Sequence, residues 1–118
     1  MPSRHPERRF RDILENIEAI EHYTRDLDER AFVASDLFVD AVERCFSRLC
    51  GAARKLDEIA EDLAPDQPWK KIRDLGNVLR HDYDTVERPD LWGIVAKDLP
   101  SLKVACQRAL ASLGDRDP

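Results

Sequence analysis

Apolar side chains return at steps of three and four residues along most of the chain, and this period constrains the fold more than any other feature. A one-sided stripe of this kind is typical of an amphipathic helix that buries one face. The first stripe predicts a helix over about residues 7–26. Its members are Phe10, Ile13, Leu14, Ile17, Ile20, Tyr23 and Leu27.

A second long stripe follows after a short turn. Asp28 is the expected N-cap of a helical turn over residues 29–34, and Ser35 is the expected N-cap of a helix from residue 36 to about 63. The long helix is predicted to be unbroken. Its core stripe consists of Val39, Val42, Phe46, Leu49, Ala53, Leu56, Ala60 and Leu63.

Prolines divide the rest of the chain into helices. Pro65 and Pro68 end the second long helix, and a third begins near residue 68 and ends within residues 82–89. Pro89 suits the start of the last helix, which Pro100 should kink or break because proline lacks the N–H that an inner turn requires.

The predicted fold class is therefore all-α, an antiparallel bundle of four main helices with the last one kinked or broken near Pro100. The 118 residues suit one core, so we expect a single domain over 1–118 with an ordered core of about 7–113. Hydrophobic residues make up 42% of the chain and charged residues 36%, a balance that favours a helical bundle over a sandwich or barrel.

Several classes of protein are disfavoured. No stretch reaches the roughly 20 apolar residues that cross a bilayer, and the polar N-terminus has no apolar signal region, so we expect a cytoplasmic protein. Cys45, Cys50 and Cys106 form an odd set without a C-x-x-C pair, which predicts buried thiols and no metal or cofactor.

The formal net charge of −5 argues against a general electrostatic binder of nucleic acid, so any contact with RNA must be local. Two basic clusters are candidates, although solvated helix faces give similar clusters. One contains the four arginines between Arg4 and Arg11. The other consists of Lys70, Lys71, Arg73 and Arg80.

Polar, reactive side chains are concentrated on the predicted third helix. Arg73, Asn77 and His81 follow one another at four-residue steps on one face, and Arg80 lies beside them. The opposite face, with Ile72, Leu75 and Leu79, belongs to the core. A purely structural interpretation also fits: His81 could cap the last carbonyls, Arg80 could interact with the helix dipole, and Tyr83 could anchor the bundle.

The chain resembles the HepT family of HEPN domains over about residues 10–113. The resemblance lies in the opening Arg11-Asp12-Ile13-Leu14, in Pro68-Trp69, and in Leu91-Trp92-Gly93-Ile94-Val95 leading to Asp98-Leu99-Pro100. The family signature R-N-x-x-x-H-x-Y is similar to the segment 76–83, in which Asn77, His81 and Tyr83 match. Gly76 stands where the family has arginine.

This resemblance implies a toxin of a HEPN/MNT toxin–antitoxin system, a metal-independent endoribonuclease that acts as a homodimer with one composite RNA site. Spacing on the face of His81 adds Arg80 as a phosphate contact, and the basic cluster makes Lys70, Lys71 and Arg73 the candidate RNA-binding residues. The resemblance implies that His81 is the acid/base and that Asn77 contacts the phosphate. It also implies that a minimal nucleotidyltransferase antitoxin transfers AMP to Tyr83 and so blocks the RNA site.

Gly76 keeps other interpretations open. Without its arginine the site lacks a charge contact to the transition state, which Arg73 or Arg80 could supply from the His81 face. The alternatives are a degenerate HEPN module that binds RNA, a nucleotide or its nucleotidyltransferase partner without cleavage, and a purely structural adaptor. A glycine within a helix also suits the close approach of another helix, such as a dimer seam.

Overall fold

The chain is described by a computed structural model, which covers residues 4–115 and contains helices and turns but no strand within that range. The elements are α1 (Pro6–Thr24), α2 (Glu29–Val33), α3 (Asp36–Leu56), α4 (Glu58–Leu63), α5 (Trp69–His81), η1 (Tyr83–Thr85), α6 (Arg88–Gly93), η2 (Ile94–Asp98) and α7 (Leu99–Asp115). None of the described helices has an apolar stretch that could cross a membrane.

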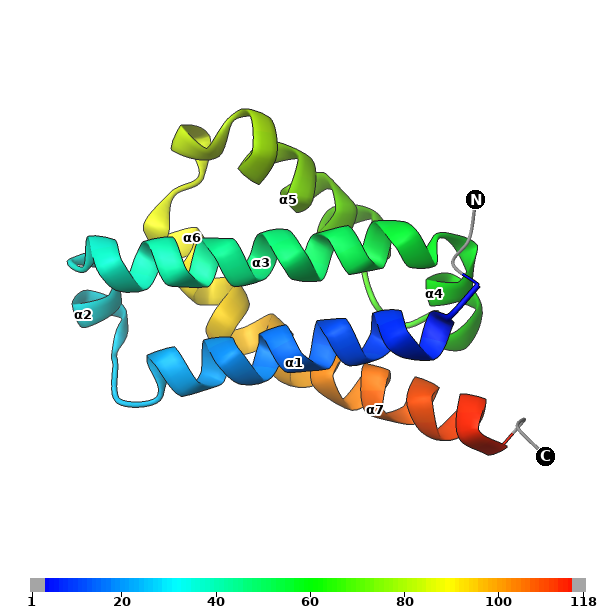
Figure 1. Cartoon of the computed structure of the whole chain (residues 1–118). Helices are drawn as coiled ribbons and strands as arrows, with labels where there is room; N and C mark the ends of the chain where they lie inside the picture. Colours follow the sequence, from blue (N-terminus) through cyan, green and yellow to red (C-terminus); the bar gives the residue numbers. More distant parts are fainter. Residues whose placement is uncertain (1–3, 116–118) are drawn as a thin grey trace.

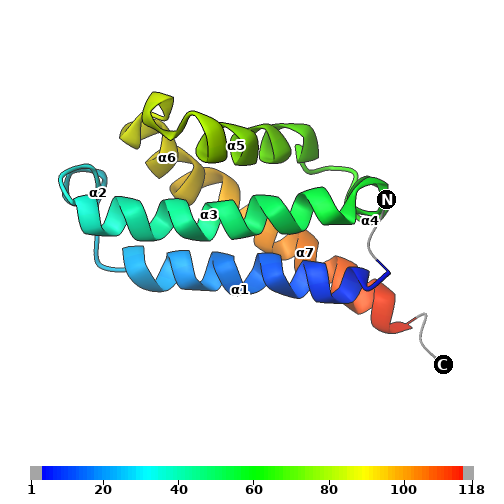
Figure 2. The ribbon, with the colours of Figure 1, turned by 45° about the horizontal axis from the view of Figure 1, so that its top comes forward.

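Helices α1 and α3 run antiparallel at the centre of the molecule (Figure 1). Helix α7 packs on α1, and α5 packs on α3 from the other side (Figure 2). The predicted all-α class and the antiparallel bundle with four long helices are confirmed. Because α5 rests mainly on α3, most of its outer surface is left to solvent.

The apolar stripes of the sequence form the core. Phe10, Ile13, Ile17 and Ile20 of α1 are completely buried, as are Val42 and Leu56 of α3. Burial of this kind contributes about 1.5–3 kcal/mol for each large side chain, which makes the stripes the main source of stability. Both predicted N-caps are confirmed: Asp28 Oδ1 accepts the Ala31 N–H at 2.8 Å, and Ser35 Oγ accepts the Phe38 N–H at 3.2 Å.

The prediction of one unbroken helix over residues 36–63 is wrong. The chain breaks at Asp57, whose φ of 51° lies in the left-handed region, and α4 starts at the next residue. The apolar stripe gave no sign of the break, because Leu56 and Ala60 on either side of it are both fully buried. A side chain from α5 holds the break: Arg73 Nη2 donates to the Asp57 carbonyl at 2.8 Å.

The proline break before α5 is confirmed, whereas the helical run continues through Pro100 with a local change of its turn. Pro68 precedes α5, and Trp69 is anchored there by a hydrogen bond of 2.8 Å from its indole N–H to the Ala64 carbonyl. Before Pro100 the α-helical pattern gives way to the π turn η2. A wider turn leaves room for the proline ring, and it accommodates the missing backbone N–H of Pro100.

The three cysteines are buried free thiols, as the sequence predicts. Burial raises the pKa of Cys50 and of Cys106 to about 12, and it also raises the pKa of Cys45. These thiols therefore stay protonated at neutral pH.

Candidate functional site

The C-terminal end of α5 brings together four of the predicted site residues. Asn77, Arg80 and His81 are all exposed in the last two turns of the helix, and Tyr83 starts the turn η1 directly after it. The helix ends at His81, because Asp82 leaves the helical conformation after its N–H has bonded to the Val78 carbonyl at 2.7 Å. These side chains are thus held on regular helix and on one tight turn rather than on a long loop.

The structural interpretation of His81 and Tyr83 finds no support in these contacts. Within residues 4–115 no hydrogen bond engages the His81 ring, so this histidine does not cap the carbonyls of its helix. Tyr83 is 65% exposed and therefore does not anchor the bundle. Both side chains are accessible to a ligand or to another protein.

Arg80 is free to act at this surface. Its Nη2 donates to Asn77 Oδ1 at 2.5 Å, and this is the one side-chain hydrogen bond of Arg80 within the described residues. The bond ties the two side chains to each other across one helical turn. It leaves most of the guanidinium donors for an anionic group beside His81.

Arg73 has a different environment, although it shares the helical face that the sequence indicated. Its Nη1 and Nη2 bind the Glu61 carboxylate at 2.9 and 2.7 Å, and its Nε donates to the Ala53 carbonyl at 3.4 Å. Its side chain is only 23% exposed. Arg73 therefore joins α5 to the end of α3 and to α4, and its donors are largely used.

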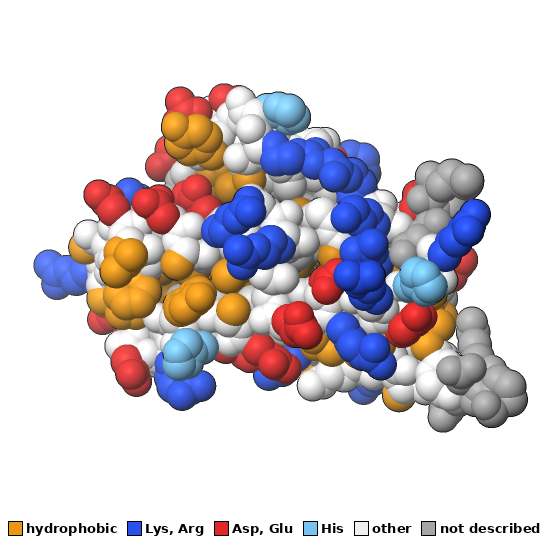
Figure 3. All heavy atoms as spheres, viewed as in Figure 1, with side chains coloured by type: hydrophobic (Ala, Val, Ile, Leu, Met, Phe, Trp, Pro, Cys, Tyr) orange, Lys and Arg blue, Asp and Glu red, His pale blue; other side chains and the backbone are white. Residues whose placement is uncertain are grey.

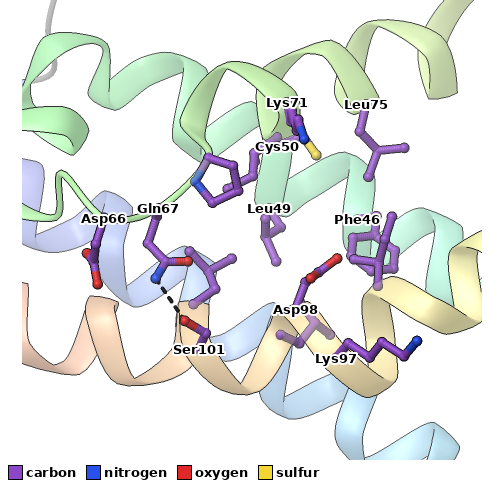
Figure 4. Close-up of a pocket in the computed structure, with 15 residues that line it drawn as sticks. Phe46, Leu49, Cys50, Asp66, Gln67, Lys71, Leu75, Lys97, Asp98 and Ser101 are labelled. Carbon is purple, nitrogen blue, oxygen red and sulfur yellow. Dashed lines mark hydrogen bonds between the residues drawn. The ribbon is translucent and has the colours of Figure 1, made fainter.

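Lys70 and Lys71 lie in the first turn of α5, about 15 Å along the axis from the end of the helix at a rise of about 1.5 Å per residue. Lys70 forms an exposed ion pair of 2.9 Å with Asp74. Lys71 lies on another flank, at a pocket of about 370 Å³ between α5 and the segment η2–α7 (Figure 4). The structure does not bring these lysines to His81.

The pocket in Figure 4 is separate from the polar cluster. Its floor is apolar and comes from α3, and its rim carries Lys71, Lys97 and Asp98. One hydrogen bond of 3.0 Å, from Gln67 Nε2 to Ser101 Oγ, crosses its edge (Figure 4). None of Asn77, Arg80 and His81 lines it. The candidate site is an open surface of the single chain.

Comparison with known proteins identifies the family to which this arrangement belongs. The family model described as Ribonuclease HepT-like matches residues 13–109, a range that includes all of α5. The chain belongs to the HepT-like ribonuclease family.

Relatives of this HepT-like chain include archaeal proteins. One from Methanocaldococcus jannaschii, named "Putative RNase MJ1380", is 32% identical over 78% of this chain and 84% of its own. The "Probable ribonuclease HepT" of Thermococcus cleftensis is 33% identical over the same shares. A second Methanocaldococcus jannaschii protein, "Putative RNase MJ0125", is 24% identical over 98% of this chain and all of its own length. No solved structure matches the chain.

Gly76 stands at the arginine position of the HepT signature, and it is buried against α3. A Cβ built on Gly76 would lie 2.6 Å from Cys50 Cβ, well inside van der Waals contact. The expected close approach of another helix is confirmed, but the seam lies between α3 and α5 of one chain and is not a dimer seam. Position 76 of this HepT-like chain has no room for an arginine unless α3 moves.

A set of cations on α3 was not predicted from the sequence. Arg44, Arg48 and Lys55 are exposed on the outer face of this helix, and Figure 3 shows basic side chains gathered over the C-terminal half of α3 and the adjoining parts of α5 and α1. Their spacing of four and seven residues is the signal that places them on one face. The apolar stripe of α3 indicates its buried face and says nothing about these exposed side chains.

Proposed function

We propose that this HepT-like chain is the toxin of a HEPN/MNT toxin–antitoxin system, a metal-independent endoribonuclease that acts on RNA in the cytoplasm. The observation that carries the proposal is the exposed cluster of Asn77, Arg80 and His81 at the end of α5, in a chain of a ribonuclease family. An imidazole beside an unshielded guanidinium supplies a proton-transfer group and a phosphate-binding group on one rigid element.

The proposed reaction is cleavage by the RNA's own ribose. The 2′-oxygen attacks the adjacent phosphorus, a bond forms between them, and the bond from phosphorus to the 5′-oxygen breaks, which leaves a 2′,3′-cyclic phosphate and a 5′-hydroxyl. A neutral imidazole of His81 accepts the proton of the 2′-hydroxyl, and a protonated imidazole gives a proton to the leaving 5′-oxygen. Arg80 stabilises the charge on the phosphoryl oxygens, and Asn77 holds Arg80 in position through their mutual hydrogen bond.

The need for two imidazoles supports a homodimer. One α5 helix ends with one His81 and one Arg80, and no carboxylate of the described part of the chain pairs with this arginine. Two copies that meet with these helix ends facing each other would supply an acid and a base at one composite site. Light scattering should give a mass close to twice the chain mass of 13.6 kDa.

Tyr83 is the proposed point of control by a minimal nucleotidyltransferase antitoxin. The tyrosine oxygen loses its proton and attacks the α-phosphorus of ATP, the bond from that phosphorus to pyrophosphate breaks, and AMP stays bonded to the tyrosine oxygen. Tyr83 is 65% exposed two positions after His81, which suits both access by another enzyme and blockage of the RNA site by a negative phosphate. Incubation with the antitoxin and ATP should add one AMP to the parent chain and none to Tyr83→Phe.

The proposal is tested by inducible expression of the chain alone in a bacterial host, with growth and RNA integrity as readouts. We expect the parent chain to arrest growth and cut RNA, and His81→Ala to do neither. Arg80→Ala should lower the cleavage rate by about 10² or more, since it removes a charge contact to the transition state. Soluble, folded parent protein that leaves RNA intact would contradict the proposal.

A second candidate is a catalytically degenerate HEPN module that binds RNA, a nucleotide or its nucleotidyltransferase partner without cutting. Gly76 favours it, because the arginine of the family signature has no counterpart at that position and no space there. The same experiment separates the candidates. Binding of RNA by parent and His81→Ala alike, with no cleavage by either, would favour the degenerate module.

A further inference from the structure

A groove of about 570 Å³ lies between α1 and α3, on the face shown in Figure 3. Small residues, among them Ala19 and Gly51, form part of its lining, so a ligand's backbone can approach closely. Four cations from the two helices line it, namely Arg9, Arg48, Arg54 and Lys55. Two carboxylates, Asp12 and Glu15, lie on the α1 side, so the lining is basic overall.

The cations of the α1–α3 groove are available to a ligand. Within residues 4–115 no hydrogen bond or ion pair engages the side chains of Arg48, Arg54 and Lys55. Arg9 contacts Asp12 at 3.3 Å, and its buried Nε–H has no acceptor among the described residues. Arg73, by contrast, is paired with Glu61 at 2.7 Å. Because the net charge of the chain is −5, this concentration of cations without an acidic partner among the described residues is a local feature and does not reflect the overall charge.

Helix α3 lies between the α1–α3 groove and α5, which carries the candidate site. Helices α3 and α5 are antiparallel, with Gly76 against Cys50 and Arg73 against Ala53. Arg80 lies one turn after Gly76 along α5 and is exposed, which brings it level with the turn of α3 that carries Ser47. Figure 3 shows basic side chains on α5, on α3 and near α1 over the C-terminal half of α3, and acidic side chains toward the N-terminal end of α3.

We propose that the α1–α3 groove binds the phosphates of a single-stranded RNA whose scissile bond lies at His81 and Arg80. This inference rests on the proposed ribonuclease function and extends it by a path for the substrate. Arg48 and Lys55 are seven residues apart, about 10 Å along the helix axis, so the two cations can contact different phosphates of one strand. The groove contacts the RNA backbone and so gives affinity without sequence preference.

The binding test uses the full chain with His81→Ala, so that the RNA stays intact. A fluorescently labelled oligouridylate is titrated with this protein and with the same protein carrying Arg48→Gln and Lys55→Gln, at several salt concentrations. Both side chains are exposed, so the fold should be kept, and light scattering checks the mass of each protein. The matched control carries Arg25→Gln and Arg30→Gln, the same change of charge at the far end of α1 and on α2.

We expect the Arg48/Lys55 double variant to bind the oligouridylate about tenfold more weakly, with a salt slope reduced by about 0.7 for each phosphate that the protein no longer neutralises. The control should bind within about twofold of its parent. Binding by the groove variant that equals the control would overturn the proposal. A fall in affinity that accompanies a change in the oligomeric mass would also overturn it, because the groove would then be a contact between subunits.

A cleavage assay with His81 intact separates this proposal from the ribonuclease function. The groove variant should cut RNA with a raised KM and a kcat near that of the parent, since its substitutions lie away from the reacting bond. Cleavage by the groove variant with unchanged KM would contradict the proposed role of the groove and would still support the ribonuclease function. If RNA binding depends on the groove but the parent chain does not cut RNA, the ribonuclease function is contradicted and the role of the groove in binding is supported.

Discussion

Gly76 of α5 lies so close to α3 that a Cβ built on it would stand 2.6 Å from the Cβ of Cys50. We predict that Gly76→Ala lowers the free energy of unfolding by up to about 2 kcal/mol, because the gain in helix propensity of about 1 kcal/mol offsets only part of an overpacking cost of about 1–3 kcal/mol. Urea denaturation measures the change. Gly51→Ala is the control: beyond the backbone of its own helix and its chain neighbours, no described atom lies within 4 Å of a Cβ built there, so it should stabilise α3 by about 0.5–1 kcal/mol.

A second substitution, at Cys50, tests whether the cost of Gly76→Ala comes from the contact between these two residues. On a Cys50→Gly background the added methyl group of Gly76→Ala meets no Cβ, so the substitution should cost less there than in the parent chain, and the difference is the coupling free energy. Equal costs of Gly76→Ala on the two backgrounds would show that the two residues do not limit the approach of α3 and α5.

Gly76→Arg tests whether the family signature can be rebuilt. We predict that this variant unfolds at lower temperature than the parent and cuts RNA no faster, because position 76 faces α3 and not the exposed surface of Arg80 and His81. Thermal unfolding and the cleavage rate are measured on the same preparation. A folded Gly76→Arg protein with a clearly higher rate would mean that α3 yields and that the arginine reaches the site.

Arg73 is predicted to stabilise the break between α3 and α4. Arg73→Ala removes a two-point contact with Glu61 and the donors to the Ala53 and Asp57 carbonyls, so the free energy of unfolding should fall by about 1.5–3 kcal/mol. Lys70→Ala is the control on the same helix, since its exposed pair with Asp74 should contribute at most about 0.5 kcal/mol. Equal effects in chemical denaturation would argue against this role for Arg73.

The same contact predicts a dependence on pH. The hydrogen bonds from Arg73 hold the pKa of Glu61 below its usual range. A carboxylate with a lowered pKa in the folded state contributes stability above its unfolded pKa and loses it as the pH falls through the folded one. Between pH 7 and about pH 3 the parent should therefore lose more stability than Glu61→Gln, as measured by urea midpoints. Parallel losses would show that the pair is not maintained in solution.

The three thiols are predicted to react only in the unfolded chain. Cys45, Cys50 and Cys106 are buried, and the pKa of Cys50 and of Cys106 is raised to about 12 by burial, so little thiolate exists at pH 8. A thiol reagent should label the native protein slowly and the denatured protein at once. Rapid labelling of one native cysteine would identify a region that opens locally.

The sequence alone determined which face of each helix is buried. The period of the apolar residues predicted Phe10, Ile13 and Ile17 as core, and capping chemistry predicted the roles of Asp28 and Ser35. Both signals are local, since they depend on residues within one or two turns, and local signals can be read from the order of residues. The cluster at the end of α5 was predicted for the same reason.

Only the tertiary structure decided which of two arginines on one helix is free. The sequence does not distinguish Arg73 from Arg80. In the structure Arg73 binds Glu61 and the Asp57 carbonyl at the break after α3, whereas within residues 4–115 the side chain of Arg80 bonds only to Asn77. The seam at Gly76 and the α1–α3 groove also depend on pairs of helices. Gly76 and Cys50 meet across 26 residues of sequence, and Arg9 and Arg48, which line the same groove, are farther apart still. The period of a sequence specifies the buried face of a helix, but it carries no information on the partner or the depth at which that face packs.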